Sequence, residues 1–109
     1  MTQTKQDLAK RVLIELEVIN ATEVPEHEDA ELVKDYYTTK LASLVDDGKA
    51  YWPADEIPDA AFTAVAQIMA DNCKKAFGKQ YENLQEGLDS LAEHISKQSD
   101  GQPTVIEYF

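Results

Sequence analysis

Cysteine is nearly absent from this sequence of 109 residues, in which Cys73 stands alone. A single cysteine forms no disulfide within its own chain, so the class of small disulfide-stapled domains is excluded. Because Cys73 lies on the apolar face of a predicted helix, we expect a packed thiol in a reducing compartment. The apolar runs fall short of the roughly 20 residues that a membrane span needs, and we see no basic-then-apolar leader. We therefore expect one soluble domain that is used without secretion and has no membrane partner.

Motifs that carry catalysis are also missing. The sequence has no glycine-rich phosphate loop, no HExxH, no CxxC and no GxSxG. His27 lies among carboxylates without a second His or Cys at ligand spacing, and no acid or nucleophile is arranged with His94. The DDG turn that ends at Gly48 fails as an EF-hand loop, because Val45 and Ala54 would occupy ligand positions. We expect no enzyme, no metal site and no cofactor.

Basic residues are scarce, since 10 Lys and Arg stand against 21 Asp and Glu, for a formal charge of −11. The acidic excess falls in residues 21–59 (net −8) and 80–109 (net −5), whereas residues 60–79 carry a net charge of +2. Phosphate backbones repel such a chain, so we expect no sequence-independent binding of DNA or RNA. An acidic surface either lets nearby DNA pass without adhesion or simply keeps a small protein soluble.

Helical periodicity dominates what is present and predicts an all-α fold. We expect a small bundle of about four helices over residues 1–98, followed by an extended C-terminal arm at residues 99–109. The predicted helices cover roughly residues 5–19, 30–47, 58–77 and 79–97, separated by an acidic proline-containing connection at 20–29 and by turns at Gly48 and Gly78.

The third of these segments is the most apolar and is predicted to be the central helix. It begins close to Pro58, and the positive end of its dipole explains the nearby Asp55, Glu56 and Asp59 better than an acid–base pair does. More than half of its circumference is apolar, through Ala61, Ala64, Val65, Ile68, Met69, Cys73, Ala76 and Phe77. On this pattern Asn72 is a buried, hydrogen-bonded amide, and Gln67 faces solvent.

The other helices are predicted to pack on the central one. Thr4 and Asp7 form a capping box for the first helix. Its apolar face comprises Leu8, Val12, Leu13, Leu16 and Ile19. The second helix turns seven residues toward the core, namely Leu32, Val33, Tyr36, Tyr37, Leu41, Leu44 and Val45. The fourth helix has only a narrow stripe, which is typical of a helix on the outside, formed by Leu84, Leu88, Leu91 and Ile95.

The first helix carries a second apolar pair. Ile14 and Val18 are four residues apart on nearly the opposite side from the main face, between Lys10 and Arg11. A helix with only one buried face has no need of them, so we expect a second contact there. The sequence leaves open whether a loop or tail of the same chain or a neighbouring copy provides it.

The C-terminal arm ends in strand-forming residues that have no predicted strand to pair with. Such an extended apolar terminus either adds a strand to a partner or folds back over its own helices, and the sequence does not choose between these. The residues concerned are Thr104, Val105, Ile106, Glu107, Tyr108 and Phe109.

Four stretches together resemble the head-to-tail adaptor proteins of tailed phages. They are DLAKRVLIELEVI, the acidic proline connection, the close of the second helix in DDGKAYW, and the IPDAAF entry to a helix of small residues. The nearest likeness is to the tail accessory factors of short-tailed phages, also called DNA-stabilisation or head-completion proteins, over about residues 5–80. Members of that family often carry glycine-valine after the leucines of the first helix, where Glu17-Val18 stands here.

This resemblance implies a structural virion protein that forms a homo-oligomeric ring, dodecameric by the likeness, beneath the portal protein. The ring would lie in the neck between capsid and tail, after assembly in the host cytoplasm. It would prolong a channel through which DNA passes without specific binding, and offer a platform for a downstream tail or nozzle protein. By the same likeness, the arm of Thr104 to Phe109 would engage the portal, and Arg11, Ile14 and Val18 would lie between subunits.

An alternative from a different class is a non-virion acidic helical module, either a regulator or a mimic of DNA charge that occupies a basic protein surface. If the protein is a monomer or dimer that binds a basic partner and does not bind portal proteins, this alternative is favoured.

Overall fold

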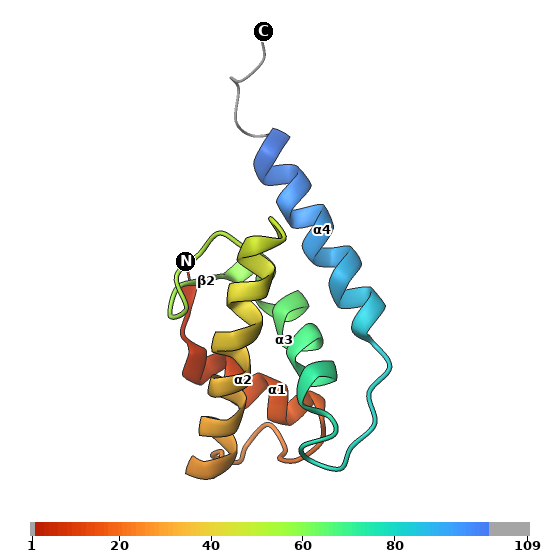
Figure 1. The fold of residues 1–109 in the computed structure, drawn as a ribbon. Helices are drawn as coiled ribbons and strands as arrows, with labels where there is room; N and C mark the ends of the chain where they lie inside the picture. Colours follow the sequence, from red (N-terminus) through yellow and green to blue (C-terminus); the bar gives the residue numbers. More distant parts are fainter. Residues whose placement is uncertain (1, 101–109) are drawn as a thin grey trace, which may run out of the picture.

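The computed structural model describes residues 2–100 of the chain. These residues form four helices and one pair of two-residue strands, which are joined by loops (Figure 1). In chain order they are β1 (Thr2–Gln3), α1 (Lys5–Glu15), α2 (His27–Asp46), β2 (Ile57–Pro58), α3 (Asp59–Cys73) and α4 (Leu84–Asp100). The predicted all-α bundle is confirmed. The antiparallel pairing of β1 with β2 was not predicted, because two residues are too few to show an alternating pattern.

Helix α3 is the centre of the bundle, as its sequence predicted. Helices α1, α2 and α4 all pack on it, and Figure 1 shows α3 between α4 and the other two. It begins directly after Pro58. The acids at this end of the helix bind the first residues of the chain. Asp55 accepts a hydrogen bond from the Lys5 amide (3.2 Å), and Asp59 accepts one from the Gln3 side chain (3.0 Å). Its nine buried residues are Ala61, Ala64, Val65, Ala66, Gln67, Ile68, Met69, Ala70 and Cys73.

Two polar residues of α3 are the reverse of the prediction. Asn72 is exposed, whereas Gln67 is buried under α4, where its amide donates to Glu86 Oε2 at 3.0 Å. The cause is Gly87, which lets α4 approach so closely that a Cβ built on it would lie 3.0 Å from the carbonyl oxygen of Ala64. The apolar pattern of α3 alone does not reveal which side this fourth helix covers.

Helix α1 has the predicted capping box, in which the Asp7 amide donates to Thr4 Oγ1 and the Thr4 amide donates to Asp7 Oδ2, both at 3.2 Å. The helix ends at Glu15, four residues before the predicted end at Ile19. Glu17 takes a positive φ of 59° and turns the chain away from the helix axis.

Three chain reversals in this fold have the same pattern of two backbone hydrogen bonds. In each reversal, these bonds satisfy carbonyl groups at the end of the preceding helix. At the end of α1, the Val18 amide donates to the Leu13 carbonyl and the Glu17 amide to the Ile14 carbonyl. The same two spacings recur around Gly48 after α2 and around Gly78 after α3. Both glycines have positive φ, at 75° and 66°, so Glu17 occupies the position that glycine fills in the other two reversals.

Helix α2 buries a narrower face than predicted. Val33, Tyr37, Leu41 and Leu44 are buried, and Leu32 is partly buried, but Tyr36 and Val45 are exposed. The reason is that α2 packs against α1 and α3 on one side only, and nothing among residues 2–100 covers its outer side.

Beyond α2, the core is completed by the chain that leads into α3. Trp52 is buried there and donates its indole N–H to Tyr37 Oη at 3.1 Å. This pairing removes the cost of burying two polar groups, and burial raises the pKa of the Tyr37 phenol.

Helix α4 begins at Leu84 rather than at Lys79, because residues 79–83 run extended across the end of α1. Its stripe packs on α3 along one side only, as predicted for an outer helix: Leu91 is buried, and Leu84, Leu88 and Ile95 are partly buried. The helix continues through Asp100 and extends past the ends of the other helices (Figure 1). It therefore includes the first two residues of the predicted arm.

Candidate functional site

No group of three or more His, Cys, Asp or Glu within residues 2–100 is placed to hold a metal ion. Cys73 is fully buried, and burial raises the pKa of its thiol to about 12, so it is no nucleophile near neutral pH. His27 is exposed at the start of α2, far along the chain from His94 on α4. The other features of the described residues are hollows, an exposed turn and charged patches on the surface.

The two histidines differ in their surroundings. The Nε2 atom of His94 lies 3.0 Å from Tyr51 Oη, and the two rings stack with centroids 5.9 Å apart. Tyr51 in turn meets the buried Trp52 edge to face, at 5.1 Å between centroids. This chain of aromatic contacts ties the middle of α4 to the connection between α2 and α3. No sequence pattern indicated these contacts, because Tyr51 and His94 are 43 positions apart.

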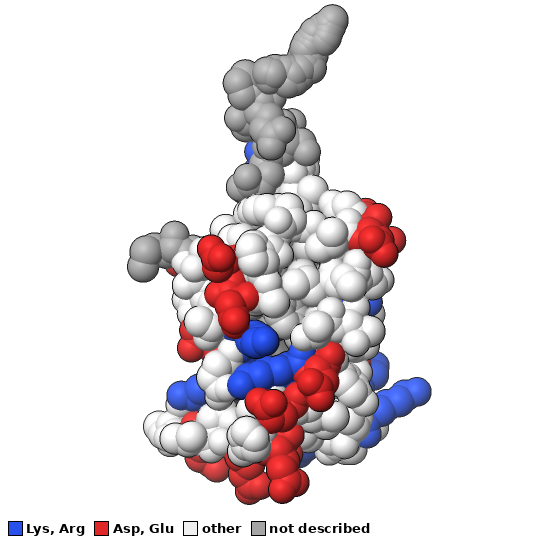
Figure 2. All heavy atoms as spheres, turned by 60° about the vertical axis from the view of Figure 1, so that its left-hand side comes forward, with Lys and Arg blue, Asp and Glu red and all other residues white. Residues whose placement is uncertain are grey.

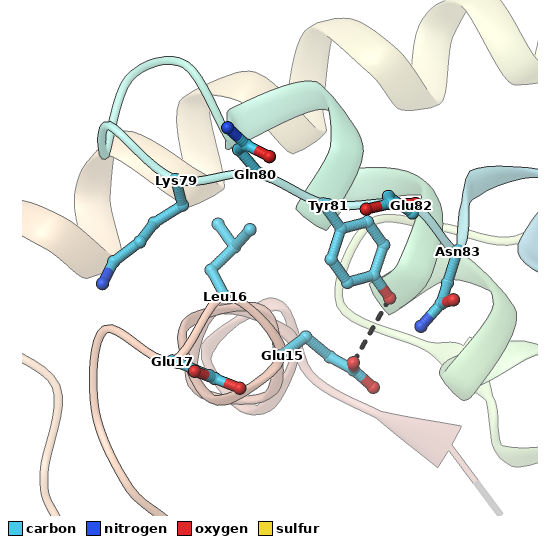
Figure 3. Close-up of a pocket in the computed structure, with 8 residues that line it drawn as sticks. All are labelled: Glu15, Leu16, Glu17, Lys79, Gln80, Tyr81, Glu82 and Asn83. Carbon is cyan, nitrogen blue, oxygen red and sulfur yellow. Dashed lines mark hydrogen bonds between the residues drawn. The ribbon is translucent and has the colours of Figure 1, made fainter.

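The segment of residues 79–83 passes over the C-terminal end of α1 and borders two hollows. On the α1 side, a groove of about 490 Å³ is lined by that segment together with Glu15, Leu16 and Glu17 (Figure 3). Tyr81 donates its hydroxyl to Glu15 Oε2 at 3.2 Å across this groove, and Figure 3 shows Leu16 pointing toward the segment. Burial, together with the charge of Glu15, raises the pKa of Tyr81 to about 12. The Tyr81 hydroxyl therefore keeps its proton at neutral pH, and its bond to Glu15 links the segment to α1.

Together with the end of α3, the same segment borders a second hollow of about 370 Å³ that is rich in lysine. We call it the lysine hollow; its lining is Lys74, Lys75, Lys79, Gln80, Tyr81 and Glu82. Lys74 is paired with Asp71 at 2.7 Å, but among the described residues no carboxylate lies within 4.0 Å of the ammonium groups of Lys75 and Lys79. The chain thus has a local positive surface, although its net charge is −11. The net charge of +2 in residues 60–79 was the sign of this positive surface in the sequence.

The connection between α1 and α2 presents an apolar side chain at an acidic turn. We call residues 20–26 the Val24 turn. Val24 is 86% exposed, the most exposed large apolar residue among those described. Hydrogen bonds of Asn20 hold the turn. Its side-chain oxygen accepts from the backbone amide of Thr22 (3.0 Å) and from the Thr22 hydroxyl (2.7 Å). Its backbone amide donates to Glu23 Oε1 (3.0 Å). The sequence predicted an exposed connection here but not a structured one.

Charges are unevenly spread over the molecular surface. Figure 2 shows one face, on which acidic side chains gather toward the lower end and a short band of Lys and Arg crosses the middle. In Figure 1 the Val24 turn and the connection from α3 to α4 both lie at this lower end. Opposite charges are therefore available at the same end of the molecule.

The predicted subunit-interface residues do not form one helix face. Because α1 ends at Glu15, Val18 follows the reversal and packs against the core of its own chain, so the same chain provides its contact. Ile14 is partly exposed, and Arg11 lies 3.6 Å from Glu15 as an i to i+4 ion pair. Ile14 and Arg11 remain available at the surface of α1.

The predicted portal-binding arm, Thr104 to Phe109, lies outside the described residues. Within the described part of the chain, no helix has both the length and the apolar character required to cross a bilayer. No family model matches this chain, and neither a curated protein nor a solved structure matches it.

Proposed function

We propose that this protein is a structural component of a tailed-phage virion, a head-to-tail adaptor that assembles as a ring beneath the portal. In this role it extends the DNA channel and provides the attachment platform for a tail or nozzle protein. It lies in the neck of the virion and is present in the host cytoplasm during assembly. The likeness of residues 5–80 to such adaptors is the origin of the proposal, and the features of the fold given below support it.

The observation that carries the proposal is the backbone at Glu17. The adaptor pattern places glycine-valine after the leucines of the first helix, and glycine favours a left-handed residue that ends a helix. In this chain the residue at that place, Glu17, has a φ of 59°, and the following Val18 packs on the core. A left-handed residue thus stands in this chain where the adaptor pattern has glycine, and this supports the proposal of a distant relationship.

The shape of the bundle also supports the proposal. Helix α4 extends past the other helices and carries the C-terminal end of the described chain away from the core (Figure 1). An arm attached there would be positioned to reach a second protein. The acidic surface suits a channel through which DNA passes without binding, since like charges repel.

The proposal is tested by mixing the purified chain with the portal protein of the same phage or prophage and sedimenting the mixture through a gradient. Co-sedimentation with the portal in a fixed ratio of subunits supports the adaptor. A chain that stays at the top of the gradient with the portal present, and that instead binds a basic protein, supports the alternative of a non-virion acidic module.

A further inference from the structure

We propose that neighbouring copies of this chain contact each other through the Val24 turn of one copy and the lysine hollow of the next. The inference rests on the proposed ring assembly, for which it names two contact surfaces. Its claim is limited to self-association, so its test can fail independently of portal binding.

The Val24 turn has the properties of a preformed docking element. Its apolar tip is 86% exposed, although a solvent-exposed valine gains nothing for the fold. The hydrogen bonds of Asn20 hold the turn in one shape before any partner arrives, which lowers the entropy lost on binding. Residues 20–29 add four carboxylates and no Lys or Arg, so the tip is surrounded by negative charge.

The lysine hollow has the complementary properties. Three lysines and a single glutamate line it, which gives it a net positive charge in a chain of strongly negative total charge. Tyr81 forms part of its wall and is fixed by the bond to Glu15, so a rigid aromatic surface is available to an apolar side chain. The amphipathic stems of Lys75 and Lys79 add further apolar area beside their charges.

The two surfaces complement each other in charge and in chemistry, and this favours a second copy as the occupant. A valine tip would enter the hollow beside Tyr81, and Glu26 and Glu28 at the base of the turn would face the lysine ammonium groups. Because the turn and the hollow are different surfaces of one chain, the contact is heterologous, and repeating it generates a ring or an open chain. Attraction between these charges falls with added salt, so the contact should weaken as ionic strength rises.

Site-directed cross-linking tests the contact directly. Val24→Cys in one batch and Gln80→Cys in a second batch, distinguished by a size tag, are mixed under mild oxidation, both in concentrated solution and on the portal. The expected product is a mixed disulfide between the two variants. Val45→Cys mixed with Gln80→Cys is the matched control, because Val45 is exposed on α2 and outside both surfaces. Cys73 is fully buried and stays reduced, as the unsubstituted protein will show.

Charge reversal provides a second, independent measurement. Lys75→Glu alone and Glu26→Lys alone should each weaken self-association at least tenfold by analytical ultracentrifugation, and the double variant should recover most of it. Lys49→Glu, which makes the same charge change on an exposed residue elsewhere, should have no more than a small effect. Circular dichroism of each variant is the control that checks whether its helices are retained.

The outcomes separate the contact from the adaptor role. Rings on the portal without the mixed disulfide, or a double variant no better than the single ones, overturn the contact and leave the adaptor role standing. A mixed disulfide in solution with no portal binding supports the contact and overturns the adaptor role. No excess of mixed disulfide over the control in either setting overturns the contact.

Discussion

Gly87 of α4 lies so close to Gln67 of α3 that a Cβ built on the glycine would stand 2.9 Å from the Cβ of Gln67. The same added atom would lie 3.0 Å from the backbone oxygen of Ala64 and 3.3 Å from Ile68 Cγ1. By helix propensity alone this glycine costs about 1 kcal/mol relative to alanine. Its place in the helix is explained by the packing of α4, because no other residue permits this approach.

We predict that Gly87→Ala lowers the free energy of unfolding, although alanine is the better helix former. Overpacking of a tight contact costs about 1–3 kcal/mol, and the backbone of Ala64 is not free to move aside as a side-chain tip would be. Urea denaturation measures the change, with Ser90→Ala on the exposed side of α4 as the control. A Gly87→Ala protein that is as stable as the original would show that α4 does not pack this closely.

The second prediction concerns Glu17. Because its φ is 59°, replacing it with glycine removes the steric cost of a Cβ in the left-handed region, and we expect Glu17→Gly to stabilise the protein by ~0.5–1 kcal/mol. Glu17→Ala is the matched control, since it removes the charge and keeps the Cβ. Equal stability of the two variants in thermal unfolding would contradict the assigned backbone.

Cys73 provides a prediction about pH. Burial raises the pKa of this thiol from 9.0 to about 12. The folded state therefore holds the proton more tightly than the unfolded state, so this contribution to stability is complete below pH 9 and is lost as the pH rises toward 12. We expect the free energy of unfolding to fall with rising pH in that window, and to fall less steeply in Cys73→Ala.

The same burial predicts the reactivity of the thiol. At pH 8 a disulfide reagent should leave Cys73 unmodified in the folded protein and react with it at once in denaturant. Rapid modification under native conditions would place the thiol at the surface, against its complete burial in α3.

How far the sequence determines this fold is best judged from particular residues. The cap formed by Thr4 and Asp7, the start of α3 at Pro58 and the turn at Gly48 were all predictable, because each depends on neighbours within a few positions. The end of α1 was not, because Glu17 adopts a conformation that its side chain does not favour. Tertiary packing on Val18 and the hydrogen bonds of the reversal override the local preference.

The candidate surfaces were less predictable than the fold. Glu15 and Tyr81 meet across 66 positions of sequence, so no local pattern indicates the groove between them. The acidic connection at residues 20–29 and the net positive charge of residues 60–79 were visible as separate signals. Their position at the same end of the bundle is a property of the fold and appears only in three dimensions.

The arm provides a prediction about docking. Removing Thr104 to Phe109 should leave the helical content and melting temperature nearly unchanged, because the core and the apolar residues packed against it lie between Leu8 and Ile95. It should abolish binding to the portal, since those residues are the segment proposed to add to that partner. A truncated chain that binds the portal as well as the full chain does would contradict the arm's role and leave the rest of the adaptor proposal in place.

The most direct test of the adaptor proposal is the mass and shape of the chain in solution, alone and then mixed with the portal protein of the same phage or prophage. Light scattering gives the mass, and negative-stain microscopy gives the shape. We predict that the chain adds to one end of the portal as a ring with its own symmetry and extends the channel. A chain that stays free of the portal, at concentrations well above micromolar, would contradict the proposal.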